Sequence, residues 1–343
     1  MTSRERWEAV LRGEETDRVP TDYWATDEVT ERLAAELGCE GKRGICRELG
    51  IDYVVSLAPE YVGPEIFGGE DMYGCRHRDV AYETGAYREC VRNPLAEYET
   101  VEEIERGYTW PTADWFDYSR IRELAEGEEK NPIRAGGSEP FLIYKNLRGQ
   151  EQAFMDLILK PEMVHYCLDR LFDFCYQNTL RIFEQVPGRV LFSYVAEDMG
   201  GQEDLMFSPE QIREFLIPRM KRMMDLVHGA GAYVFFHSDG AVRKILPEMI
   251  AAGIDVLNPI QWRCRGMERD ALKRDFGDQV VFHGGVDNQQ TLAFGTPEDV
   301  REEVRYNLEV LGRDGGYILA PCHNIQPVTP AENIVAMYEE NRL

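Results

Sequence analysis

Several features are missing from this sequence, and each absence excludes a class of protein. No stretch approaches the roughly 18 apolar residues that a membrane-spanning helix needs. Residues 1–15 lack the apolar core of a signal peptide, which predicts a cytoplasmic protein without membrane contact. The 8 cysteines form no Cys-x-x-Cys pair, so reduced thiols are expected rather than a disulfide framework.

Basic residues are also scarce. The chain has 38 Lys and Arg against 62 Asp and Glu, a net charge of −24. A polyanion would be repelled by this averaged field, which argues against nucleic acid as a partner. The acidity does not exclude a local basic pocket.

What the sequence does contain is a regular alternation of short apolar strands and amphipathic helices. This alternation over 343 residues predicts one α/β domain, residues 1–343, folded as a (β/α)8 TIM barrel. The alternative is a doubly wound open sheet, although no glycine-rich phosphate loop follows the first strand. The predicted strands are residues 18–24, 51–57, 131–137, 189–195, 232–236, 254–260, 279–285 and 315–321.

One segment interrupts the alternation. Residues 58–100 alternate polar and apolar side chains and carry several glycines, which predicts a β-hairpin insertion between strands two and three. An insertion of this kind is expected to act as a lid or an interface element, and we expect a homodimer that uses part of it.

The stretch FFHSDG, residues 235–240, places a histidine and an aspartate where an apolar strand ends. In a barrel the carboxyl ends of all strands meet on one face, which is where catalytic residues lie. The same reasoning collects one set of polar and aromatic strand-end residues: Tyr23, Trp24, Glu197, Asp198, His237, Asp239, Asn258, Gln261, His283, Asp287, Cys322 and His323.

Four stretches, residues 197–240, 253–261, 282–304 and 315–339, resemble the uroporphyrinogen decarboxylase superfamily. The resemblance implies a (β/α)8 barrel. True uroporphyrinogen decarboxylases carry an arginine-rich N-terminal stretch that holds substrate carboxylates, whereas the corresponding place here, VPTDYWATDEVTERL, has no arginine before Arg32. The sequence therefore looks closer to the other branch, the zinc-dependent methyltransferases that use a corrinoid protein or a thiol.

In that branch the resemblance implies a zinc site made of His-x-Cys after strand five and a cysteine after strand eight. Here His237 and Cys322 match, but Asp239 stands where the middle cysteine is expected. The third metal ligand is then either Asp239 or Glu197 from the neighbouring strand, and His, Cys and carboxylate ligands all suit zinc. Without a metal, His237 and Asp239 form a hydrogen-bonded pair in a substrate pocket.

The remaining predicted roles follow from position at the barrel mouth. Asp239, His323 and Asp287 are predicted catalytic residues, with a structural role as the alternative for His323 and helix capping as the alternative for Asp287. The residues expected to line the mouth and contact a cofactor are Tyr23, Trp24 and Asn258. The function that the resemblance implies is zinc-dependent transfer of a methyl group from a small methylated substrate to a corrinoid carried by a partner protein, or to a thiol. The alternatives are a metal-free decarboxylase and a non-catalytic binding protein.

Overall fold

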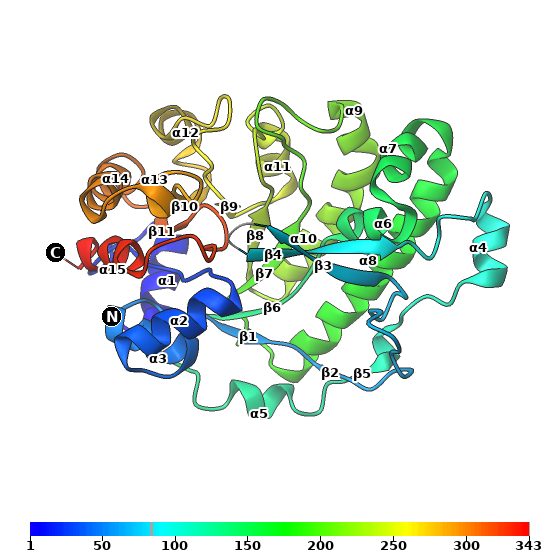
Figure 1. Ribbon diagram of the computed structural model, residues 1–343, viewed down its shortest axis with the longest axis horizontal. Coiled ribbons are helices and arrows are strands. Elements are labelled where there is room, and N and C mark those ends of the chain that lie inside the picture. Colours follow the sequence, from blue (N-terminus) through cyan, green and yellow to red (C-terminus); the bar gives the residue numbers. More distant parts are fainter. Residues whose placement is uncertain (83–84, 343) are drawn as a thin grey trace.

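A curled parallel β-sheet with helices along its outer face forms the centre of the molecule in the computed structural model (Figure 1). The structure describes residues 1–82 and 85–342. Seven strands follow one another in the order β1-β6-β7-β8-β9-β10-β11, and every pairing is parallel. The long helices α8, α10 and α14 pack against β6, β7–β8 and β10–β11 respectively. The α/β prediction is confirmed.

The strands of this sheet are β1 Val55–Leu57, β6 Ile133–Ser138, β7 Phe192–Ala196, β8 Tyr233–His237, β9 Val256–Asn258, β10 Val281–Val286 and β11 Tyr317–Pro321. The helices are α1 Ser3–Leu11, α2 Asp27–Leu37, α3 Gly41–Leu49, α4 Val101–Gly107, α5 Ile121–Ala125, α6 Pro140–Arg148, α7 Gln150–Leu159, α8 Pro161–Gln185, α9 Pro209–Gln211, α10 Ile217–Gly229, α11 Leu246–Ala252, α12 Arg269–Phe276, α13 Thr291–Phe294, α14 Pro297–Val310 and α15 Ala331–Glu340.

The first predicted strand, residues 18–24, joins the sheet through single bridges rather than a continuous ladder. Thr21 pairs with Leu319 in a parallel bridge beside β11. On its other side, Thr21 is linked to the chain before β1 by side-chain bonds: its backbone N–H donates to Asp52 Oδ2 (2.9 Å), and Asp52 N–H donates to Thr21 Oγ1 (3.0 Å). The segment thus lies between β1 and β11, the two edge strands of the sheet, and is linked to both sides. This arrangement is consistent with the predicted (β/α)8 barrel.

Side chains alternate between an inner and an outer face along each strand, as the pleat requires. On β8, Phe235 packs in the small cluster inside the sheet, whereas Val234 and Phe236 pack under the helices. The same alternation puts Phe192, Val256, Val281 and Ile318 inside. Trp7 of α1 stacks on Phe192 with 5.2 Å between ring centroids, so α1 contributes directly to the inner cluster. His237 follows Phe235 by two residues and therefore also faces inward.

Inside the segment predicted as an insertion, β3 (Arg76–Tyr82) pairs antiparallel with β4 (Gly85–Arg92). Residues 83–84, which connect the two strands in the chain, lie outside the described residues. A second two-stranded sheet joins β2 (Glu60–Tyr61) to β5 (Phe116–Asp117), after a 3₁₀ turn at Ala113–Trp115. Both pairs lie between β1 and β6 in the chain.

Two of the helices begin with well-formed caps. Ser208 and Thr296 each accept a hydrogen bond from the third helical residue in a complete capping box, with proline at the first helical position. A π-helical turn, Ile212–Leu216, directly precedes α10, whose second residue is Pro218, and proline commonly distorts a helix in this way. Among the residues described, no helix combines the length and apolar character needed to cross a membrane.

Candidate functional site

Three side chains converge where β7 and β8 end. His237 is the last residue of β8 and is 7% exposed. Its Nε2 lies 3.6 Å from Asp198 Oδ1 and 4.0 Å from Asp239 Oδ1. One ligand atom from each of the three residues lies within 4.8 Å of the others, the only such group found in the described part of the chain. We call these residues the His–Asp–Asp group.

The loops that carry the two aspartates are held against each other by backbone contact. Gly240 has φ +85°, and a Cβ built there would lie 2.4 Å from the carbonyl carbon of Gly200. Ser238 is fully buried, and its hydroxyl accepts a hydrogen bond from Met199 N–H at 2.9 Å. Asp239 N–H in turn donates to Asp198 Oδ1 at 3.2 Å. The sequence Ser-Asp-Gly after His237 is therefore what brings two carboxylates to one imidazole.

Behind His237 runs a chain of buried polar groups. His237 Nδ1 lies 2.6 Å from Asn258 Oδ1, and Asn258 Nδ2 lies 2.7 Å from His283 Nδ1. His283 Nε2 is 3.3 Å from Asp22 Oδ2, which also accepts a hydrogen bond from Trp24 Nε1 at 2.7 Å. Asn258 and His283 are 0% exposed. We call Asp22, His283 and Asn258 the buried relay.

The buried relay determines which nitrogen of His237 carries the proton. Burial lowers the pKa of His283, so its ring is neutral, and the Asp22 carboxylate requires its Nε2 to be the donor. Nδ1 of His283 then accepts from the Asn258 amide, which turns the amide oxygen toward His237 and makes His237 Nδ1 the donor. The lone pair of His237 Nε2 is left facing Asp198 and Asp239.

The Nε2 lone pair of His237 and the two carboxylates face one another with no positive charge between them. This set of donor atoms fits a divalent cation. Zinc takes histidine nitrogen and aspartate oxygen in sites that keep an open position for substrate. The relay gives His237 the orientation that metal-bound histidines need, with the other ring nitrogen donating to a fixed acceptor. Burial raises the pKa of Asp239, and the nearby Asp198 adds to this, whereas His237 and His323 oppose it.

The predicted ligands Cys322 and Glu197 lie outside the His–Asp–Asp group. The Cys322 thiol is buried and donates to the carbonyl of Ile260 at 3.0 Å, and burial raises its pKa well above the ordinary value. Glu197 is 1% exposed and accepts a hydrogen bond from Phe141 N–H at 2.8 Å, at the start of α6. Burial also raises its pKa well above the ordinary value.

The other predicted residues have distinct environments. His323 is half-exposed, with Nε2 at 3.8 Å from Asp239 Oδ2. Asp287 accepts hydrogen bonds from Arg263 Nε and from the backbone N–H groups of residues 289–291, so its carboxylate caps a turn. Trp24 lies over His237 with 6.3 Å between ring centroids. Tyr23 is buried among the outer core residues, and its hydroxyl contacts Thr30.

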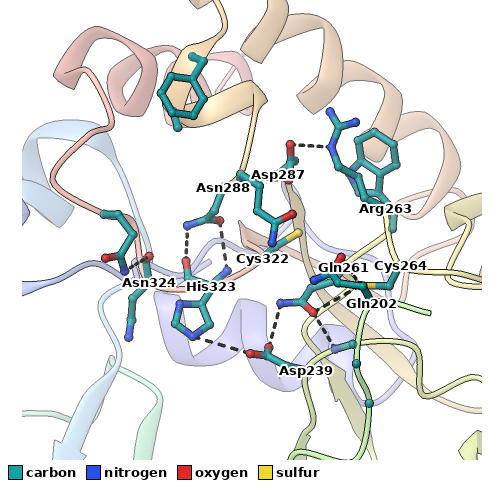
Figure 2. Close-up of a pocket in the computed structure, with 18 of the residues that line it drawn as sticks. Gln202, Asp239, Gln261, Arg263, Cys264, Asp287, Asn288, Cys322, His323 and Asn324 are labelled. Carbon is teal, nitrogen blue, oxygen red and sulfur yellow. Dashed lines mark hydrogen bonds and ion pairs between the residues drawn. The ribbon is translucent and has the colours of Figure 1, made fainter. Parts of the chain in front are cut away.

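A cavity of about 540 Å³ opens beside Asp239 (Figure 2). In the close-up, Asp239, His323 and Gln261 are joined by dashed lines, and the Gln261 amide donates to Asp239 Oδ1 at 3.0 Å. Cys322 lines the same cavity. A second cavity of about 380 Å³ lies on the Trp24 side and also includes Asn324, which the two cavities share. The His–Asp–Asp group thus reaches the first cavity through Asp239. On the side of the second cavity, the ring of Trp24 stacks on His237.

Sequence reasoning missed Asp198 as a ligand and Glu139 altogether. Strand alternation carries the signal for Asp198: it shares the inward parity of Phe192 and Tyr194, whereas Glu197 shares the outward parity of Val195. No comparable signal exists for Glu139, which lies just before α6. Burial raises the pKa of its carboxyl to about 7, with contributions from Asp198 and Asp239.

The raised pKa of Glu139 predicts a pH-dependent gain in stability for Glu139→Gln. The folded state holds the proton up to about pH 7 and the unfolded state only to about 4.5, so folding stability falls as pH rises through this window. At pH 8, in the presence of a chelator, Glu139→Gln is expected to be more stable than wild type by up to about 3 kcal/mol. Below pH 4.5 the gain should vanish.

Urea unfolding at pH 4.5 and pH 8 measures this difference. Glu184→Gln, an exposed position on α8, is the control and should show no pH-dependent gain. Equal stability of wild type and Glu139→Gln at pH 8 would contradict the predicted environment of this carboxyl.

The sequence model described as uroporphyrinogen decarboxylase (URO-D) matches residues 82–342. The uroporphyrinogen decarboxylase of Pseudoalteromonas translucida is 24% identical over 319 residues, covering 87% of this chain and 80% of that protein. The uroporphyrinogen decarboxylase of an Anaeromyxobacter species is 26% identical over 204 residues, but the match spans only 52% of that protein.

A methyltransferase is also among the relatives. The methylcobamide:CoM methyltransferase of Methanosarcina barkeri is 31% identical over 135 residues, covering 39% of this chain and 36% of that protein. Among solved structures, a methyltransferase from Methanosarcina mazei superposes with a TM-score of 0.72 at 21% identity, covering 100% of this chain and 98% of that one. At this identity the superposition establishes a shared fold.

Proposed function

Because the chain belongs to the uroporphyrinogen decarboxylase family, we propose that it is a zinc-dependent methyltransferase of that family, built as one (β/α)8 domain over residues 1–343. In this proposal it moves a methyl group from a small methylated substrate to a corrinoid on a partner protein, or to a thiol. The observation that carries the proposal is the His–Asp–Asp group, whose three ligand atoms lie within 4.8 Å of one another.

His237, Asp239 and Asp198 would hold the metal in this proposal. When bound, zinc supplies Lewis acidity that makes a methyl-bearing oxygen a better leaving group or keeps a thiol as thiolate. The residues of the chain do the rest. The buried relay fixes His237, Gln261 orients Asp239, and His323 lies at the cavity where it can exchange a proton with bound substrate.

The alternative function, decarboxylation of a carboxylated substrate, has relatives of that name in its favour. The position of Arg32 argues against a porphyrinogen substrate. Its guanidinium donates to the carbonyls of Pro327 and Thr329, so it is engaged within the fold rather than directed at a substrate carboxylate.

Two measurements test the proposal. The first is the zinc content of the purified protein. The second is methyl transfer to free cob(I)alamin, monitored by absorbance, from a panel of methoxyaromatics, methylamines and methanol. We expect about one zinc per chain after purification without chelator. Asp239→Ala should weaken zinc binding about 10-fold or more. Glu197→Ala is the matched control and should retain zinc, because the Glu197 carboxylate accepts a hydrogen bond from Phe141 N–H and lies outside the His–Asp–Asp group.

The opposite pattern, with zinc lost in Glu197→Ala and kept in Asp239→Ala, would replace the proposed ligand set by the one that includes Glu197. Wild-type protein without zinc and without methyl transfer would reject the function itself.

A further inference from the structure

The second cavity, of about 380 Å³, is lined by two cationic side chains that the proposed function does not use. Arg134 comes from β6 and Lys42 from α3, and both line this cavity together with the rings of Trp24, Phe192 and Tyr194. Trp24 and Tyr194 also touch the metal-binding side, with ring centroids 6.3 and 5.1 Å from that of His237. The cavity therefore adjoins the His–Asp–Asp group.

Neither cation has a carboxylate partner in the described ranges, 1–82 and 85–342. The Arg134 guanidinium lies 5.9 Å from the centroid of the Tyr194 ring, and the Lys42 ammonium lies 5.9 Å from the centroid of the Tyr23 ring. In a chain with 62 acidic residues, two half-buried cations without an ion pair at one cavity are unexpected. A half-buried cation without a carboxylate partner is stabilised by an anionic ligand that contacts it.

The acidic groups that face the cavity do not neutralise these cations by contact. Asp22 lines it, but its oxygens accept hydrogen bonds from Tyr23 N–H, Trp24 Nε1 and His283 Nε2. Asp27 lies in the first turn of α2 and is exposed to solvent. Burial raises the pKa of the Asp22 carboxyl, but the hydrogen bond from His283 and the charge of Lys42 outweigh this and hold that pKa below its ordinary value, so Asp22 offsets part of the Lys42 charge without an ion pair. Neither cation is hydrogen-bonded to a carboxylate, and both can bind an anionic ligand.

We propose that the second cavity binds the carboxylate of a small substrate with an aromatic body. The planar Arg134 fork matches a carboxylate, Lys42 adds a second positive charge, and Trp24 and Tyr194 offer ring faces to the apolar part. A volume of about 380 Å³ holds a single substituted ring. This inference rests on the proposed function: the site would present a methyl group of an aromatic acid to the His–Asp–Asp group. The first cavity would then receive the methyl acceptor.

Binding of benzoate to the full chain, measured by calorimetry and by tryptophan fluorescence, tests this site without methyl transfer. Benzoate should bind at least about 10-fold more tightly than benzyl alcohol, which has the ring but no charge. Arg134→Gln should weaken benzoate binding about 10-fold or more and leave benzyl alcohol unchanged. Lys42→Gln should weaken benzoate binding by a smaller factor, since an ammonium makes no bidentate contact.

Arg47→Gln is the matched control, since Arg47 lies on the same helix as Lys42 but is exposed and pairs with Glu48. It should bind benzoate as wild type does. Thermal unfolding establishes that each variant is folded. Benzoate binding unchanged in both Arg134→Gln and Lys42→Gln, or equal affinity for benzoate and benzyl alcohol, would overturn the proposal.

The same titration with a chelator present separates this inference from the proposed function. Benzoate affinity that stays within about threefold assigns the binding to the cations rather than to a metal. Protein that binds benzoate through Arg134 but contains no zinc would reject the proposed function and leave the carboxylate site standing. Affinity that is lost with the metal would overturn the carboxylate site.

Discussion

His237→Ala is expected to purify with less than about a tenth of the wild-type zinc and to lose methyl transfer by a factor of about 10³ or more. His237 supplies the only nitrogen in the His–Asp–Asp group, and its Nε2 lone pair is directed at both carboxylates. Without it, Asp198 and Asp239 remain as two like charges with no third ligand. Metal analysis and transfer to cob(I)alamin measure the two losses.

The fold should survive this substitution. His237 lies at the end of β8, beyond the inner cluster around Phe235, and a large core does not depend on a catalytic metal for its folding free energy. The free energy of unfolding should fall by no more than about 1–3 kcal/mol, the cost of leaving Asn258 without one partner. His228→Ala, at an exposed histidine paired with Asp255, is the control. A His237→Ala protein with stoichiometric zinc would disprove the metal site.

Asn258→Leu is expected to weaken zinc binding about 10- to 100-fold although Asn258 is not a ligand. The substitution removes the acceptor for His237 Nδ1 and the donor for His283 Nδ1 at a fully buried position. His237 is then free to carry its proton on Nε2, which faces Asp198 and Asp239. Two buried ring nitrogens also lose their partners, at about 1–3 kcal/mol each.

Asn333→Leu separates this positioning role from a general loss of stability. Asn333 is also fully buried, and its amide donates to the carbonyls of Leu292 and Gly295, away from the two histidines. Both variants should unfold at lower urea concentration than wild type, but only Asn258→Leu should lose zinc affinity. If both variants bind zinc as wild type does, the buried relay has no part in orienting His237.

Much of the site could be predicted from the position of residues at strand ends. His237 and Asp239 follow the apolar run 233–236, whose side chains alternate between the inner and outer faces of the sheet. The structure places both residues beside Asp198. The same alternation, applied one strand earlier, separates inward Asp198 from outward Glu197, although adjacency in the sequence made the two look equivalent. The resemblance to the uroporphyrinogen decarboxylase family is confirmed by the match over residues 82–342.

The sequence by itself determined the strand–helix order, the helix caps and the face on which polar residues gather, because these depend on local periodicity and on the chain direction of parallel strands. Only the tertiary structure decided which of those residues meet. Cys322 turns its thiol to the carbonyl of Ile260, whereas Asn258 bridges two histidines from neighbouring strands. Arg134 and Lys42, 92 positions apart in the printed sequence, come to line one cavity. Such encounters depend on side-chain direction and on the packing of distant segments, which no local pattern in the chain records.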